Sequence, residues 1–187
     1  MATVKWQIDP AHSSVEFAVK HMVFTTVRGR FKNFTGAIEI DEQNPNNSKV
    51  EVEIDAASID TGVADRDAHL RSADFLDVDN HPKISFKSTR VEGAHKSAGD
   101  HFRVSGLLTI HGKALEVTLS STFEGVGKDP WGNERAGFTA AAEVDRREWG
   151  LMWNQALETG GLLVANKLKI EIDAQAIKQA ATGQAVA

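Results

Sequence analysis

Residues 15–21 read Val15-Glu16-Phe17-Ala18-Val19-Lys20-His21, and large apolar side chains recur in them at every second position. Successive side chains of a β-strand point to opposite faces, so a period of two is typical of a strand with one buried face. Later stretches repeat this alternation at residues 50–55, 83–88, 115–121 and 167–173. Antiparallel sheets with one solvated face require such a pattern.

Turn signals separate these stretches. They lie at Asn44-Pro45-Asn46-Asn47, in the polar loop 93–99, at His111-Gly112 and in the cluster 129–133. The links are too short for repeated crossover helices, which argues against parallel pairing. About eight to ten strands at this spacing predict an all-β, antiparallel barrel or sandwich.

One stretch between the strands departs from the alternation. Residues from about 63 to 76 predict a short helix, capped by Asp60 or Thr61, that would serve as a lid or plug beside the barrel. The pattern shows no repeat and no domain boundary. We therefore expect a single β-barrel domain over residues 1–177 and a frayed C-terminal tail over 178–187.

Composition narrows the classes of partner. The chain has 187 residues, a formal net charge of −5 and no cysteine, so disulfides and thiolate metal sites are excluded. The negative charge and the lack of a basic run argue against nucleic acid and anionic membranes as partners. No run of about 18 apolar residues predicts a transmembrane segment. Without a leader-like start we expect a cytoplasmic protein, or a periplasmic one if a leader has been removed.

Catalytic and metal-binding patterns are not found in the sequence. There is no phosphate-binding glycine loop and no nucleophile elbow. Asp74, Asp77 and Asp79 lack the glycine and the terminal glutamate of a calcium loop. No two histidines have the short spacing that is typical of a zinc site. The seven histidines are His12, His21, His69, His81, His95, His101 and His111. We therefore predict no catalytic residues, no metal and no cofactor.

Small residues on the expected inner face leave room inside a barrel. Ala140 and Ala142 share a face with Phe138, and Gly106 shares one with Leu108. Such residues opposite aromatic side chains predict a cavity, as in barrels that hold one ligand. The alternative is a solid core in which large and small side chains interdigitate.

Four blocks of the sequence together resemble one known family, the YceI-like polyisoprenoid-binding family. The first block contains Trp6-Gln7-Ile8-Asp9, His12-Ser13 and residues 15–21 and 27–31. The other three blocks are residues 66–77 with 82–88, residues 106–112, and residues 145–150 with 168–172. Their order and spacing cover residues 4–175. The resemblance implies an extended, lipocalin-like, eight-stranded antiparallel barrel whose apolar interior holds a long isoprenoid chain or a similar lipid.

The pattern and the resemblance together predict a binding or carrier protein for a polyisoprenoid, such as an isoprenoid quinone or a prenyl phosphate, or for a fatty lipid. Residues expected to line the interior are Phe17, Val19, Phe31, Phe86, Leu108, Leu119 and Phe138. Residues expected near an entrance are Phe24, Trp149 and Trp153, in apolar stretches outside the best alternation. Residues that could hold a polar head group are His21, Arg28, Arg146 and Asn154.

Two other classes stay open. An enzyme could act on a lipid-like or quinone substrate in the same cavity, with His21, or His69 beside Asp67, as an acid–base pair. The polar group Arg66, Asp67 and His69 fits better as a network that anchors the helix. A solid barrel could instead serve as a stress-related interaction module. A homodimer is plausible on the base rates of soluble oligomers.

Overall fold

The computed structural model describes residues 3–181. The strands are β1 (Thr3–Ile8), β2 (Ser14–His21), β3 (Thr25–Phe31), β4 (Phe34–Asp41), β5 (Lys49–Asp55), β6 (Ile59–Asp60), β7 (Lys83–Glu92), β8 (His101–Ile110), β9 (Lys113–Lys128), β10 (Glu134–Asp145) and β11 (Val164–Lys178). The α-helix is α1 (Ala64–Arg71), and short 3-10 turns cover Pro10–His12, Pro45–Asn47, Ala56–Ser58 and Arg146–Trp149.

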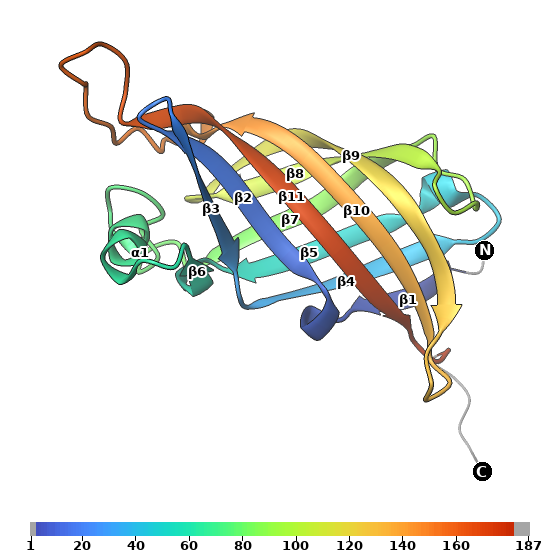
Figure 1. Cartoon of the computed structure of the whole chain (residues 1–187). Helices are drawn as coiled ribbons and strands as arrows, with labels where there is room; N and C mark the ends of the chain where they lie inside the picture. Colours follow the sequence, from blue (N-terminus) through green and yellow to red (C-terminus); the bar gives the residue numbers. More distant parts are fainter. Residues whose placement is uncertain (1–2, 182–187) are drawn as a thin grey trace.

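Antiparallel pairing joins these strands into one closed barrel (Figure 1). β1 and β2 pair with successive parts of β11, so they form one bent line along its edge. In the same way β3 and β4 pair with β2 and β1, and β5 and β6 pair with β4 and β3. Three of the eleven strands thus continue the line of another, which leaves eight positions around the barrel. The predicted eight-stranded antiparallel barrel is confirmed.

The barrel closes where β1 meets β11. Trp6, Gln7 and Ile8 pair with Lys178, Ile177 and Ala176. Since β1 and β11 pair at these three positions among residues 3–181, the seam is short at this point, and β2 extends it along the rest of β11. Closure leaves no free edge there that another chain could extend.

Two glycines allow aromatic rings to lie directly against the inner side of the barrel wall. A Cβ at Gly29 would lie 2.3 Å from the Phe17 ring, and one at Gly106 would lie 2.6 Å from the Phe86 ring. The sequence suggested that Gly106 leaves empty space. The structure shows that the Phe86 ring fills the space above Gly106. This glycine therefore makes room for a packed side chain and adds no cavity volume.

The helix is shorter than the sequence predicted. It covers Ala64–Arg71, and the chain from Ser72 to Leu76 continues in turns. Neither Asp60 nor Thr61 caps it, because Val63 occupies the N-cap position and makes no side-chain cap. Ser72 ends the helix, where its backbone N–H donates to the His69 carbonyl.

The two ends of the barrel carry different loops (Figure 1). The helix end, as we call it, comprises the turn 22–24, the segment 61–82 with α1, the hairpin 111–112 and the segment 146–163. The termini end comprises the loops 42–48, 93–100 and 129–133. Among residues 3–181, no helix has the length and apolar character needed to cross a bilayer.

Candidate functional site

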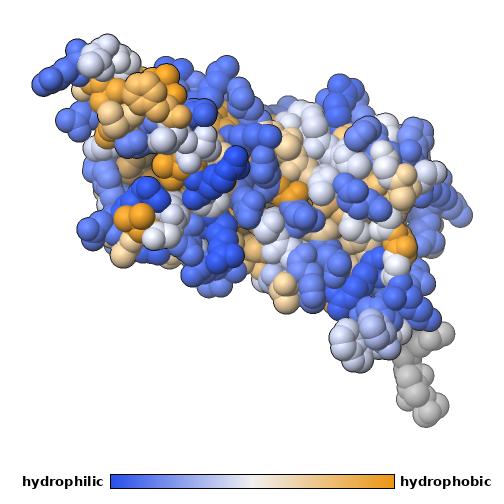
Figure 2. Space-filling view, in the orientation of Figure 1, coloured by the Kyte–Doolittle hydropathy of each residue, from blue (hydrophilic) through white to orange (hydrophobic). Residues whose placement is uncertain are grey.

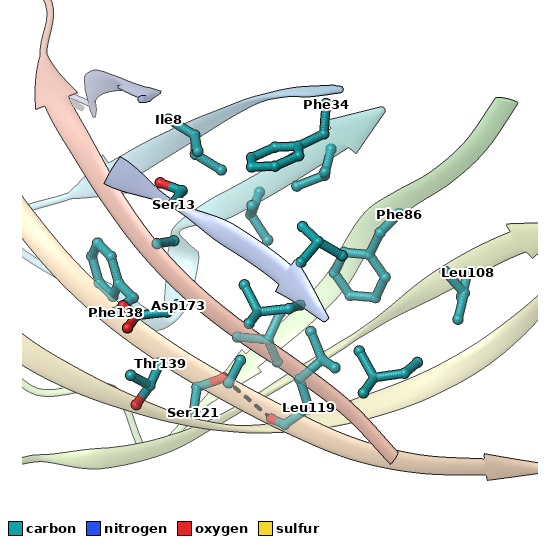
Figure 3. A pocket seen from close by; sticks show the side chains of 18 of the residues that line it. Ile8, Ser13, Phe34, Phe86, Leu108, Leu119, Ser121, Phe138, Thr139 and Asp173 are labelled. Atoms are coloured by element: carbon teal, nitrogen blue, oxygen red, sulfur yellow. Dashed lines mark hydrogen bonds between the residues drawn. The ribbon is translucent and has the colours of Figure 1, made fainter. Parts of the chain in front are cut away.

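An apolar cavity of about 610 Å³ occupies the barrel interior. Every line of strands contributes to its wall, because the alternation along each strand turns the apolar set inward. Figure 3 shows side chains from many strands converging on this space, among them Ile8, Phe34, Phe86 and Leu119. The interior is therefore not the solid core that the sequence left open as an alternative.

All seven residues expected to face the interior line this cavity: Phe17, Val19, Phe31, Phe86, Leu108, Leu119 and Phe138. Their placement follows from strand register. On β10, for example, Phe138 and Ala140 pair with Ala174 and Ile172 of β11, which also line the cavity. Whether these residues bind a ligand stays a prediction.

Segment 146–163 closes the helix end. Trp149 is 2% exposed, and its indole Nε1 donates to the Leu108 carbonyl over 3.0 Å. Leu151 is also buried and lines the cavity beside it. Trp149 is thus fully packed, with its indole hydrogen bond satisfied, and does not line the cavity. Its place near an entrance stays a prediction.

Arg146 lies beside this wall, and four of the five N–H groups of its guanidinium are directed at backbone carbonyls. Its guanidinium donates to the backbone carbonyls of Leu151, Trp153 and Ala165 at 2.7 to 3.0 Å, and more weakly to Val164 at 3.5 Å. Burial lowers its pKa below the ordinary arginine value. Arg146 lines the cavity, but its hydrogen bonds hold the segment 146–163 rather than leaving the side chain available to a head group.

The other head-group and entrance candidates lie outside the cavity wall. Phe24 is 82% exposed, and Arg28 is exposed on the outer face of β3. Asn154 exchanges hydrogen bonds with the backbone of Val164. Trp153 packs on the rings of His69 and Phe75, with centroids 4.6 and 5.3 Å away. His21 pairs with Val164 at the end of β2 and does not line the cavity.

Exposed apolar side chains do gather at the helix end (Figure 2). They lie in two adjacent segments, since the Met22 N–H donates to the Leu163 carbonyl over 2.9 Å. The exposed members are Met22, Val23, Phe24, Met152 and Leu162. These five side chains therefore form an apolar surface at the helix end, while Trp149 and Leu151 of the same segment are buried.

At the termini end the cavity reaches polar residues. Lys49, the first residue of β5, and Lys96, in the loop 93–100, are exposed residues that line the cavity. Glu42 and His95 line it as well. Trp6 lines the same part of the cavity, is 4% exposed, and has an indole Nε1 without a hydrogen-bond partner among residues 3–181. No sequence pattern around Trp6 predicts an unpaired donor.

The helix carries a structural network. Asp67 accepts from the backbone N–H and the hydroxyl of Thr61, at 2.8 and 2.6 Å. Arg66 donates to the hydroxyl and the carbonyl of the same threonine. His69 pairs instead with Asp74, at 2.8 Å. The acid–base pair of His69 with Asp67 is therefore not formed, and the interpretation as a helix anchor fits these contacts.

These features define a class of protein: a closed antiparallel barrel around an apolar cavity. Residues 6–176 match the YceI-like domain, and the chain belongs to the YceI-like family. It is 40% identical over 150 residues to a UPF0312 protein of Pectobacterium atrosepticum, covering 80% of this chain and 76% of that one. It is 41% identical over 140 residues to a UPF0312 protein of Pseudomonas aeruginosa, covering 75% and 71%.

Solved structures share the fold. BcnA of Burkholderia cenocepacia superposes with a TM-score of 0.75 at 25% identity, covering 90% of this chain and 98% of that one. A polyisoprenoid binding domain of Saccharophagus degradans, implicated in plant cell wall breakdown, superposes with a TM-score of 0.70 at 12% identity. That alignment covers 93% of this chain and 98% of that domain. These likenesses agree with the barrel described above.

Proposed function

We propose that this protein binds the hydrocarbon tail of a polyisoprenoid, such as an isoprenoid quinone or a prenyl phosphate, inside the barrel and carries it. The observation that carries the proposal is the apolar cavity of about 610 Å³ that is lined from all sides of the barrel. The YceI-like family and the ligand named for the Saccharophagus domain favour the same class of lipid.

The volume suits a long tail. An engineered cavity of about 150 Å³ holds benzene, so the 610 Å³ found here has room for about two dozen carbon atoms. That corresponds to roughly five isoprene units. A longer tail, or its head group, would extend past the polar loops of the termini end, because the residues that line the other end, such as Leu76 and Leu151, are buried. Each buried methylene contributes about 0.8 kcal/mol, so affinity would come from the tail.

Catalysis is not part of this proposal. The alternative was an enzyme acting on a lipid-like or quinone substrate with His21 or His69. Neither histidine lines the cavity, and His69 is engaged with Asp74. A general base has to lie within hydrogen-bond reach of the proton that it removes from a bound substrate. The geometry therefore supports binding over turnover.

The test begins with the purified protein in native mass spectrometry, followed by lipid extraction. We expect a co-purifying apolar lipid, or uptake of one geranylgeranyl-tailed quinone per delipidated chain. The same quinone without its tail is the matched control and should bind at least a hundredfold more weakly. A C18 fatty acid in parallel distinguishes prenyl from straight chains. Equal binding of the tailed and tail-less quinones would overturn the proposal.

A further inference from the structure

Two histidines and an aspartate meet at the helix end, on segments that are far apart in the sequence. Asp77 and His81 follow α1, and His111 forms the tip of the hairpin between β8 and β9. One ligand atom from each, a carboxylate oxygen or an imidazole nitrogen, lies within 4.8 Å of the others. The two imidazole centroids are 4.6 Å apart. All three residues are half-buried.

The backbone holds these residues in uncommon conformations. Asp77 has φ 47° and His111 has φ 53°, and they are two of the four non-glycine residues with positive φ among residues 3–181. Left-handed backbone costs free energy for any residue with a Cβ, and such strain concentrates at functional sites. The His81 N–H donates to the Asp77 carbonyl over 2.8 Å, which fixes the turn between them.

Neighbouring groups orient the side chains. Asn80 donates to both carboxylate oxygens of Asp77, at 3.2 and 3.0 Å. Gly112 provides room for His81, since a Cβ there would lie 2.9 and 3.0 Å from its Cε1 and Nδ1. Outer groups that orient ligands in this way typically strengthen metal sites. Asn80 would do so for the carboxylate of Asp77.

We propose that Asp77, His81 and His111 bind a divalent transition-metal ion, with Zn²⁺ as the representative. Zinc binds two imidazoles and a carboxylate at about 2.0–2.2 Å, with water or another ligand in the fourth position. Tetrahedral geometry at these bond lengths places ligand atoms roughly 3.3 Å apart. The three ligand atoms lie within 4.8 Å of one another, so a bound ion would draw them closer together.

The ion would join two parts of the end wall. Leu76, next to Asp77, lines the cavity, and so does Ile110, next to His111. A metal bound between them would cross-link the segment 61–82 to the β8–β9 hairpin. This site does not depend on which lipid, if any, occupies the interior. Binding to the folded state alone would also raise thermal stability as the metal concentration rises.

The test titrates Zn²⁺ into untagged, chelator-treated protein in a calorimeter. We expect one ion per chain with micromolar affinity and no binding of Mg²⁺, which prefers oxygen ligands. His81→Gln and His111→Asn should each weaken Zn²⁺ binding at least tenfold, and asparagine tolerates the left-handed backbone at position 111. His101→Asn, at the termini end, is the matched control and should stay within twofold.

A second measurement on the unaltered chain guards against misfolded variants. In ¹⁵N imidazole NMR spectra, sub-stoichiometric Zn²⁺ should shift or broaden the signals of two histidines out of the seven in the sequence. Those two should be His81 and His111, assigned by their loss in the variants. Zinc that binds no more tightly than millimolar, or equal responses from histidines elsewhere, would overturn the proposal.

Discussion

Arg135 and Asp9 lie 126 positions apart in the sequence, and Nη1 of the arginine donates to Oδ2 of the aspartate over 2.9 Å. Asp9 directly follows β1 and Arg135 lies on β10, so the pair spans the last strand, β11. Arg135 also donates to Asp129 at 2.7 Å and to Gln175 of β11 at 2.8 Å. One guanidinium thus ties together the elements that meet at the short β1–β11 seam.

Replacement of this arginine should loosen the seam. We expect Arg135→Met to lower the free energy of unfolding by about 2 kcal/mol, because it removes the guanidinium charge from beside two shielded carboxylates. Urea denaturation measures the change. Arg103→Met is the matched control, since its partner Glu92 is 3.5 Å away and both side chains are exposed. Its effect should be below about 0.5 kcal/mol. An equal loss of stability in both variants would contradict the role of Arg135 at the seam.

Acid should weaken the same seam. Hydrogen bonds, first from Arg135 and then from His12, lower the pKa of Asp9 from 3.8 to about 2, and the hydrogen bond from Arg135 also lowers the pKa of Asp129. Because the folded pKa lies below the unfolded one, this stabilisation is complete above about pH 4 and is lost as the pH falls through 2. For Asp9 we expect about 1 kcal/mol after solvent screening. The stability difference between the wild type and Arg135→Met should shrink over this range. A difference that stays constant with pH would contradict this prediction.

The alternation of residues 15–21 was enough to predict which side chains face inward, because strand geometry couples sequence position to barrel face. The ends of the barrel could not be predicted in this way. The apolar segment around Trp149 suggested an entrance, yet an apolar loop is equally suited to close a barrel. Nor could spacing reveal that His81 meets His111, since their proximity depends on how segment 61–82 folds against a distant hairpin.

The role of Arg146 can be separated from head-group binding. Arg146→Lys keeps the charge, but a lysine cannot reach several carbonyls with a planar fork. We expect a loss of about 2 kcal/mol in unfolding free energy and faster hydrogen exchange across residues 146–163. Affinity for a tailed quinone should stay within threefold. Arg147→Lys next to it, whose side chain is half-exposed and bound to Asp145, should leave the exchange rates unchanged. A selective loss of prenyl phosphate binding would instead favour a head-group role.

Filling the cavity should block the ligand without unfolding the barrel. Ala140 lines the cavity from β10, and Ala141 next to it lies on the opposite face of the strand. Ala140→Trp should weaken binding of a geranylgeranyl-tailed quinone at least tenfold, with little change in the midpoint of thermal unfolding, because the indole enters empty space. Ala141→Trp should bind normally. Strong destabilisation by Ala140→Trp, as in an overpacked core, would show that the space is not available.

The unpaired indole of Trp6 offers a test of how the ligand lies in the barrel. A buried N–H without a partner costs about 1–3 kcal/mol, so Trp6→Phe should leave the empty protein as stable or slightly more stable despite the smaller ring. If Nε1 serves a ligand carbonyl at the termini end, the variant should lose about three- to tenfold in affinity for a tailed quinone. It should lose none for the matching hydrocarbon. Trp131→Phe, on an 82% exposed turn residue, should change neither affinity. Equal losses for quinone and hydrocarbon would assign Trp6 to packing alone, and the head group would then lie elsewhere.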